Sequence, residues 1–217
     1  MKFVIGISGL AGDGKDSVSA ILREYIASHY PNVNFWRIAL ADELKSECQL
    51  ACMDIYGIDP LYCSREEKEV IRDALVFHGK MKRIETMGTY WTGKVQTEID
   101  RKHSLYPGDS VFCIPDIRYA SYSNDEVAWI KSNKNGFLIH VKKYKMIFCE
   151  KSNSFIKKYS EPVNKEEFIN CPSTEALADY VIEWEDKSPN KPEDDLDCVS
   201  VVYYVADRIF RAFTEPL

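Results

Sequence analysis

Gly9-Leu10-Ala11-Gly12-Asp13-Gly14-Lys15 is the stretch of this 217-residue sequence that decides its fold. It fits the pattern G-x-x-x-x-G-K, whose glycines let the backbone turn successive N–H groups toward phosphate oxygens. An apolar run at residues 3–8 precedes the loop, and an apolar stripe at helical spacing follows it from Val18 to Ile26. A strand before and a helix after are the context in which this pattern binds phosphate. We therefore expect residues 9–15 to cradle the phosphates of a nucleotide at a helix N-terminus.

The same loop contains the residues expected to hold the phosphoryl donor, ATP with Mg²⁺. Lys15 would reach the β- and γ-phosphates and follow the charge that develops during transfer. Asp16 stands where a Ser or Thr that ligates Mg²⁺ is usual, and two interpretations stay open for it. It holds the metal directly or through water, or it favours the first helical turn as acids do. The predicted ATP site comprises Gly9, Gly12, Asp13, Gly14, Lys15, Asp16 and Ser17, and the predicted metal ligands are Asp16 and Ser17.

The composition is that of an ordinary globular protein. A chain of this length buries enough surface to form its own core. The net charge of −6 argues against a nucleic-acid scaffold, which usually carries a basic surface. No apolar run approaches the roughly 20 residues that span a bilayer. The seven cysteines are scattered and odd in number, and without a secretion signal they indicate reduced thiols in a cytoplasmic protein.

Predicted strands and helices alternate along the chain, which favours a parallel sheet covered by helices on both faces. The strand candidates are residues 3–8, 35–40, 110–115, 137–142 and a short fifth at 168–170. The helix candidates follow Lys15, begin near Asp42 as N-cap, fill most of 64–103, and recur at 124–134, 174–184 and 198–213. The acidic, proline-containing stretch 185–197 is typical of an exposed loop.

Asp116 and Arg118 follow the third predicted strand. Ligands of parallel sheets collect beyond the carboxyl ends of strands, so both residues are expected near the phosphate loop. Asp116 could position Mg²⁺-bound water or the phosphoryl acceptor, and Arg118 could make a bidentate contact with phosphate. A purely structural Asp–Arg pair at a strand end is the alternative interpretation.

Four segments resemble the bacteriophage deoxynucleoside monophosphate kinases and their P-loop relatives, which include animal phosphomevalonate kinases. In chain order they are Gly14-Lys15-Asp16-Ser17, Leu40-Ala41-Asp42-Glu43-Leu44-Lys45, Met87-Gly88-Thr89 and Ile114-Pro115-Asp116-Ile117-Arg118. The resemblance covers about residues 3–180. It implies an α/β, P-loop NTPase-type three-layer fold with a five-stranded, mainly parallel sheet.

The resemblance also implies one kinase domain over residues 1–217. Its core would comprise 1–45, 108–142 and 166–184, with a helical acceptor-binding insertion at about 46–107. A short lid at about 143–165 would carry lysines in place of the family's arginines, and a helix at 198–213 would end the domain.

The activity implied by the resemblance is transfer of the γ-phosphoryl group of ATP to a deoxynucleoside monophosphate, giving the diphosphate for DNA precursor synthesis. It makes Lys15, Asp116 and Arg118 the catalytic residues. Glu85 stands where the family usually has a base-reading Gln. The predicted acceptor site comprises Asp42, Lys45, Arg72, Arg83, Glu85, Gly88, Thr89 and Arg118.

Two other functions stay open. The chain could be a kinase of the same fold for another phosphorylated small molecule, or an ATP-binding protein without catalysis. The expected partners are small-molecule nucleotides, with no nucleic acid and no membrane, and a homodimer is an option. The expected location is the cytoplasm, that of the host if the protein is viral.

Overall fold

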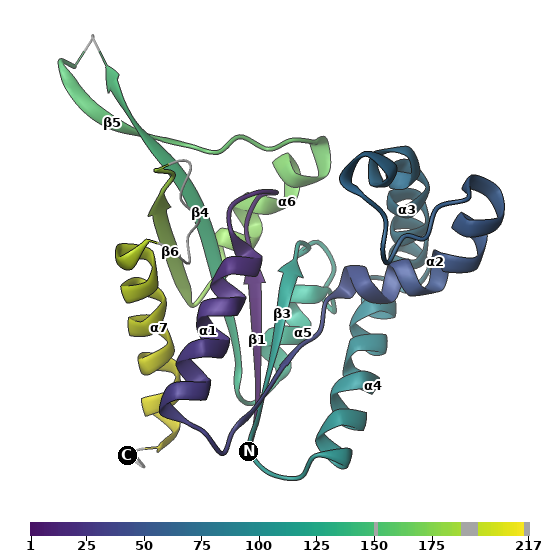
Figure 1. The fold of residues 1–217 in the computed structure, drawn as a ribbon, viewed down its shortest axis with the longest axis horizontal. Helices are drawn as coiled ribbons and strands as arrows, with labels where there is room; N and C mark the ends of the chain where they lie inside the picture. The colour runs from purple at the N-terminus through teal and green to yellow at the C-terminus, as the bar shows by residue number, and fades with distance from the viewer. Residues whose placement is uncertain (150–151, 188–194, 215–217) are drawn as a thin grey trace.

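A mainly parallel β-sheet forms the centre of the computed structural model, which describes residues 1–149, 152–187 and 195–214 (Figure 1). Five parallel strands lie in the order β2-β3-β1-β4-β6, and β5 pairs antiparallel with the far half of β4. The strands are β1 (Lys2–Ser8), β2 (Asn34–Arg37), β3 (Ser110–Ile117), β4 (Gly136–Cys149), β5 (Ser154–Tyr159) and β6 (Tyr180–Glu185). This confirms the predicted P-loop-type α/β fold, with a sixth strand added by the β4–β5 hairpin.

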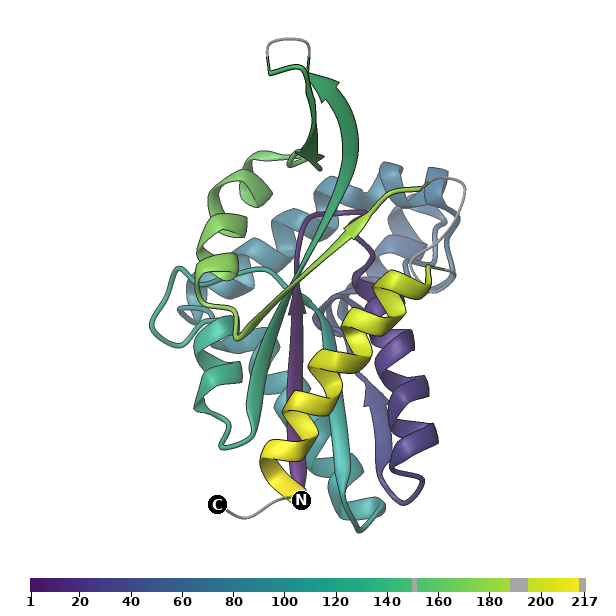
Figure 2. The ribbon, with the colours of Figure 1, turned by 90° about the vertical axis from the view of Figure 1, so that its left-hand side faces the viewer.

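Helices cover both faces of the sheet because β1 alternates its apolar side chains between them. Phe3, Ile5 and Ile7 pack in one cluster with residues of α1 (Lys15–His29) and α7 (Leu196–Thr214). Val4 packs in a second cluster with residues of α4 (Thr89–Leu105) and α5 (Glu126–Ser132). Figure 2 shows α7 lying across the sheet on the side of α1. The phosphate loop therefore starts from a strand that is buried on both faces.

Two further helices, α2 (Leu40–Tyr56) and α3 (Arg65–Glu85), form the edge of the molecule opposite α7 (Figure 1). A capping box begins α3, in which the Ser64 hydroxyl accepts from the Glu67 N–H and the Glu67 carboxylate accepts from the Ser64 N–H. Among the described residues, Cys52, Ile71 and Leu75 form a small buried cluster between α2 and α3, and the half-buried Leu44 and Cys48 pack against it. The remaining helix, α6 (Lys165–Ala176), lies beside the phosphate loop.

The beginning of α2 differs from the prediction. The strand predicted at 35–40 ends at Arg37, and Ala39 rather than Asp42 is the N-cap residue of α2. The cap is supplied instead by Asp116, whose carboxylate accepts from the N–H groups of Leu40 (2.9 Å) and Ala41 (2.7 Å). A carboxylate at this position satisfies N–H donors that the helix itself leaves unpaired. Since Asp116 lies 76 residues away from Leu40, local sequence could not reveal it.

Four other element predictions also differ from the structure. Residues 168–170 belong to α6 and form no strand, and the helix predicted at 174–184 ends at Ala176 and is followed by β6 from Tyr180. The helix formers around Glu175 masked the alternation that buries Ile182 and Trp184 in β6. β3 and β4 also run beyond their predicted ends, to Ile117 and Cys149. Residues 188–194 of the predicted acidic loop lie outside the described residues.

No helix among the described residues is long and apolar enough to cross a membrane.

A buried ion pair ties α3 to the segment before α5. Arg83 donates from Nη2 to Asp125 Oδ2 (2.5 Å) and from Nε to Asp125 Oδ1 (3.2 Å). The Asp125 side chain is fully buried and also accepts from the N–H groups of Ser121 and Tyr122. The Arg83 guanidinium lies over the ring of Tyr119, 3.6 Å from its centroid. This carboxylate is therefore shared between a helix and a loop.

We expect Asp125→Ala to lower the free energy of unfolding by about 3–5 kcal/mol, because it leaves a buried guanidinium and two N–H groups without their acceptor. Urea unfolding followed by circular dichroism measures the loss. Asp100→Ala is the control, since it removes an exposed carboxylate that faces Lys2 at 3.2 Å. Equal losses in the two variants would contradict a special role for the buried pair.

Candidate functional site

The phosphate loop lies at the carboxyl end of β1 and opens into the N-terminus of α1. Gly9 has a φ of 142°, and a Cβ there would lie 2.4 Å from the carbonyl oxygen of Val141, so only glycine fits beside β4. Gly14, with a φ of 88°, is the N-cap of α1, and no side chain caps the helix there. The N–H groups of the first turn are therefore left for an anion.

Lys15 is held inside the loop. Its Nζ donates to the carbonyl oxygens of Gly9 (2.9 Å) and Leu10 (2.7 Å). Burial lowers the pKa of Lys15, and the charge of Arg118 lowers it further. An anion placed in the loop would counteract both effects and raise the pKa of Lys15 again. The predicted donor lysine thus lies where a phosphate oxygen could replace the loop carbonyls as its partner.

Asp13 anchors the loop to β6 through its backbone. The indole N–H of Trp184 donates to the Asp13 carbonyl oxygen at 2.7 Å. The Asp13 side chain is buried, and this burial raises the pKa of its carboxyl group. Its Oδ1 has no hydrogen-bond partner in the described part of the chain. Asp13 therefore faces inward, in contrast to an exposed loop residue.

Asp16 extends into solvent from the first turn of α1, where its carboxylate contacts Arg37. Arg37 donates from Nη2 to Asp16 Oδ1 (3.0 Å) and from Nη1 to Asp42 Oδ2 (3.1 Å). The predicted residues Asp16 and Asp42 are thus joined through an arginine that sequence reasoning missed. Within the described ranges, no group of three or more His, Cys, Asp or Glu side chains is placed to hold a metal ion.

A second cavity, of about 230 Å³, opens between α2, α3 and the end of β3. Five of the predicted site residues line it, namely Lys45, Arg72, Arg83, Asp116 and Arg118. Its apolar wall is formed by Leu40, Ala41, Leu44, Leu75, Val76 and Trp91. Sequence reasoning did not place Lys68, Lys80, Tyr119 or Glu126 there. The signal for Lys68 was present, because Lys68, Arg72, Gly79 and Arg83 recur at helical spacing along one face of α3.

The charge in this cavity is unbalanced. Partial burial lowers the pKa of Lys68, and the nearby charges of Lys45, Arg72 and Arg118 lower it further. Neither Lys68 nor Arg118 has a carboxylate within 4 Å in the described residues. The other cations have one: Lys45 faces Asp42, Arg72 faces Glu69, Lys80 faces Glu166 and Arg83 faces Asp125. We conclude that the cavity is suited to an anion.

Four predicted acceptor residues lie outside the lining of this cavity: Asp42, Glu85, Gly88 and Thr89. Glu85 faces Lys82 at 3.3 Å on the exposed side of α3. Gly88 makes the turn into α4 with a φ of 94°, and a Cβ there would lie 2.8 Å from Asp125 Oδ1. The Thr89 hydroxyl donates to the Thr86 carbonyl oxygen at 2.9 Å. The Gly-Thr step therefore shapes the turn between α3 and α4.

Two acids, the half-buried Asp116 and the buried Glu126, form hydrogen bonds beside Arg118. Besides capping α2, Asp116 has a pKa that burial raises. Glu126 Oε2 accepts from the N–H groups of Arg118 (2.6 Å) and Tyr119 (3.1 Å). Burial raises the pKa of Glu126 to about 8, even though these hydrogen bonds act in the opposite direction. Glu126 is thus mostly protonated at neutral pH.

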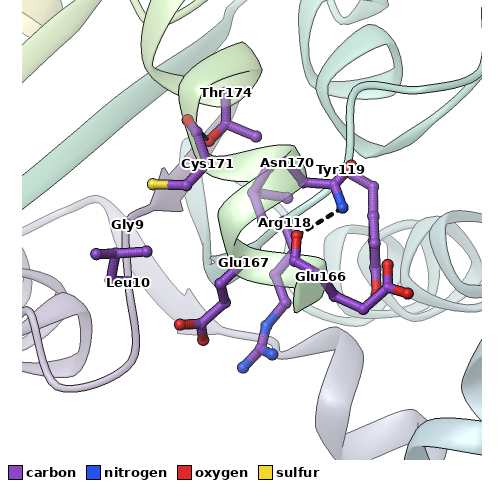
Figure 3. Close-up of a pocket in the computed structure, with 10 residues that line it drawn as sticks. Gly9, Leu10, Arg118, Tyr119, Glu166, Glu167, Asn170, Cys171 and Thr174 are labelled. Atoms are coloured by element: carbon purple, nitrogen blue, oxygen red, sulfur yellow. Dashed lines mark hydrogen bonds between the residues drawn. The ribbon is translucent and has the colours of Figure 1, made fainter. Parts of the chain in front are cut away.

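A narrow pocket joins the two sites beside α6 (Figure 3). It is lined by Gly9 and Leu10 of the phosphate loop, by Ile117, Arg118 and Tyr119, and by Glu166, Glu167, Asn170, Cys171 and Thr174 of α6. The Arg118 guanidinium and the Glu167 carboxylate extend toward the same side (Figure 3). Arg118 lines both this pocket and the larger cavity. It therefore stands between the phosphate loop and the anion cavity.

The lysines of the predicted lid lie on β4 and the β4–β5 hairpin. The β4–β5 hairpin projects from the body of the molecule (Figures 1 and 2). Its lysines face carboxylates: Lys142 with Glu175, Lys143 and Lys145 with Asp186, Lys157 with Glu183, and Lys158 with Glu161. Lys151 lies outside the described residues. Lys142 and Lys143 line a third cavity beside Asp13, together with the buried His140. Burial lowers the pKa of His140 to about 4, so it is a neutral packed residue that contacts Ser8 at 2.8 Å.

The pH dependence of stability should report the ionisation of Glu126. In the folded state the raised pKa keeps the Glu126 carboxyl protonated, whereas in the unfolded state it ionises above about pH 4.5. The free energy of unfolding therefore falls as pH rises from about 4.5 to 8, by up to roughly 1.4 kcal/mol per pH unit. Glu126→Gln keeps an acceptor for the N–H groups of Arg118 and Tyr119 and removes the titration. The variant should gain stability over the wild type as pH rises through this window, in urea unfolding at several pH values. A constant difference between the two proteins would contradict the assignment.

The comparisons with known proteins leave the family open. No protein-family model matches the sequence, and no curated protein matches it. Among solved structures, the crystal structure of TT1252 from Thermus thermophilus is similar to this chain over 99% of both chains, with 13% sequence identity and a TM-score of 0.46. A similarity at this level carries no argument about activity, so the function has to be inferred from the site itself.

Proposed function

We propose that this protein transfers the γ-phosphoryl group of ATP to the phosphate of a small molecule. The observation that carries the proposal is the place of Arg118, which lines both the pocket at the phosphate loop and the cationic cavity. A cation shared by two anion sites suits a reaction in which a phosphoryl group moves from one phosphate to another. Such catalysis depends on positioning and charge neutralisation and requires no covalent intermediate.

The phosphate loop is suited to a polyphosphate, and this supports ATP as the phosphoryl donor. The uncapped N-terminus of α1 and the inward-held Lys15 offer backbone and side-chain donors at one place. Mg²⁺ bound with ATP would neutralise charge on the transferred group. Asp16 and Ser17 remain its proposed protein ligands. In that role Asp16 would exchange its contact with Arg37 for the metal.

The two sides of the cavity support a phosphate ester as the acceptor. The cations Lys45, Lys68 and Arg118 suit the phosphate, while Leu44 and Trp91 suit an apolar or flat remainder. A deoxynucleoside monophosphate meets both requirements, and it is our first candidate. The protein would then supply deoxynucleoside diphosphates for DNA synthesis in the cytoplasm.

One observation favours a second candidate, which is a phosphorylated acceptor other than a nucleotide. Glu85, the residue expected to read the base, lies outside the lining of the cavity and faces Lys82. Among the described residues, the lining also contains no Asn, Gln, Ser or Thr side chain that could read a base edge by hydrogen bonds. Small phosphorylated acids therefore belong in the same assay.

The test is ADP release from Mg-ATP in the presence of ribo- and deoxynucleoside monophosphates, with phosphomevalonate as an outgroup. Stimulation by a deoxynucleotide supports the first candidate, and stimulation by phosphomevalonate alone supports the second. ATP binding without stimulation by any acceptor would contradict phosphoryl transfer and favour a non-catalytic ATP-binding protein.

Lys15→Ala should lower phosphoryl transfer by roughly 10²–10³-fold, because it removes a cation at the place where charge develops. The thermal midpoint should stay close to that of the wild type, since the hydrogen bonds of Lys15 in the described residues go to carbonyl oxygens of its own loop. Steady-state kinetics and differential scanning calorimetry check the two expectations. Near-normal turnover in the folded variant would contradict the donor site.

Lys68→Met should raise the KM for the acceptor by about tenfold, since it removes one charge-assisted contact with the acceptor phosphate. Its Kd for ATP, from titration calorimetry, should stay unchanged. Lys145→Met, on the exposed hairpin, is the matched control and should alter neither constant. A parallel loss of ATP binding in Lys68→Met would place Lys68 in the donor site and contradict our assignment.

A further inference from the structure

The solvent-facing side of α3 carries an apolar seam that has no partner in the described structure. The seam consists of Val70, Ala74, Phe77, Met81 and Ile84, which alternate at intervals of four and three residues. Apolar residues at these intervals form the contact line between two packed helices. The same helix already uses Ile71 and Leu75 to contact α2, so the seam is a second apolar face.

The exposure of the seam is high for side chains of this kind. Val70 is 65% exposed, Phe77 67%, Met81 40% and Ile84 46%. Scattered exposed apolar residues are normal, but a contiguous row along one helix indicates a contact surface. α3 lies at the edge of the molecule, where a second molecule could approach (Figure 1). The cationic cavity lies on another face of α3, so an occupant of the seam would leave the cavity open.

We propose that the seam pairs with the seam of a second copy of this chain, with the two α3 helices antiparallel across a two-fold axis. Antiparallel helices place the two kinds of seam position opposite each other. In one register Ala74 then faces Phe77 of the other copy, and Val70 faces Met81. A small residue opposite the largest one lets the helices approach closely, and symmetry forms each contact twice.

Charges beside the seam select the same register. Asp73 and Lys80 flank the seam on one side, seven residues apart. When Ala74 faces Phe77, Asp73 of each copy lies beside Lys80 of the other copy. The neighbouring register, with Phe77 opposite Met81, would instead place two Lys80 side chains together. Lys80 already faces Glu166 at 3.1 Å, and its three ammonium protons allow it to bind both carboxylates.

The size of the seam predicts a weak dimer. Five side chains on one helix bury less area than a standard stable interface, so we expect a Kd in the micromolar range. The arrangement is independent of the reaction proposed above, because it uses none of the residues assigned to phosphate binding; Lys80 lines the cavity and also flanks the seam.

The first test is sedimentation equilibrium of the full chain over about 1–200 µM. The wild type should pass from monomer to dimer, and Phe77→Glu should remain monomeric. Phe155→Glu is the matched control, because Phe155 is a phenylalanine of similar exposure (66%) on the β4–β5 hairpin. It should dimerise like the wild type. A monomeric wild type, or a dimer that is lost in Phe155→Glu and kept in Phe77→Glu, would overturn the proposal.

The second test addresses the register of the two α3 helices. It replaces the charged residues Asp73 and Lys80 instead of Phe77. Asp73→Lys should raise the dimer Kd by about tenfold, since it sets two lysine pairs against each other. The double variant Asp73→Lys/Lys80→Asp should recover most of the affinity, because each copy again offers both charges. Circular dichroism confirms that each variant is folded. Failure of the double variant to recover, when it is folded, would overturn the antiparallel arrangement.

Discussion

The carboxylate of Asp116 at the first turn of α2 is the contact on which the site depends. It joins the end of β3, in the centre of the sheet, to the helix that carries Lys45. Two N–H donors that a helix leaves unpaired are satisfied by one side chain from another element. This attachment of α2 adds to its packing on α4 and to the Arg83–Asp125 pair, which ties α3 to the segment before α5. The cavity between α2 and α3 depends on that attachment, so a structural carboxylate determines where an anion can bind.

Glu126 and Asp125 extend the same principle to the segment after β3. One holds the backbone of Arg118 and Tyr119, and the other holds Arg83 and the turn at Ser121. Burying acids is costly unless their oxygens are satisfied by donors. The raised pKa of Glu126 shows that this cost is only partly offset. In return Arg118 stands on a rigid segment, with a guanidinium that has no carboxylate partner within 4 Å in the described residues. A free cation on a fixed backbone is what recognition of a mobile phosphate requires.

The sequence allowed the fold to be predicted where its signals are local. The phosphate loop, the strand before it and the helix after it follow from glycines and apolar spacing within thirty residues. Lys45, Arg72, Arg83 and Arg118, which the resemblance grouped together, line one cavity, and their role in binding an acceptor stays a prediction. The role of Asp116 was missed because a cap formed between distant residues leaves no local pattern. β6 was missed because helix-forming residues precede it, and its strand state is decided by pairing with β4. The pairing of the hairpin lysines with carboxylates could not be read from a lysine-rich run.

The position of α3 explains why this protein would form the proposed dimer through that helix. Its residues divide among three directions: Ile71 and Leu75 face α2, Lys68 and Arg72 face the cavity, and Phe77 faces solvent. The contact in the first direction is small, since three buried residues form its centre in the described part of the chain. The second contains cations that repel one another until an anion arrives. A helix at the edge of the molecule would gain further support from contacts on its solvent-facing side. Pairing of two copies would supply this support while leaving the cavity accessible, so the apolar seam and the cationic cavity are two consequences of the same helix lying at the edge of the molecule.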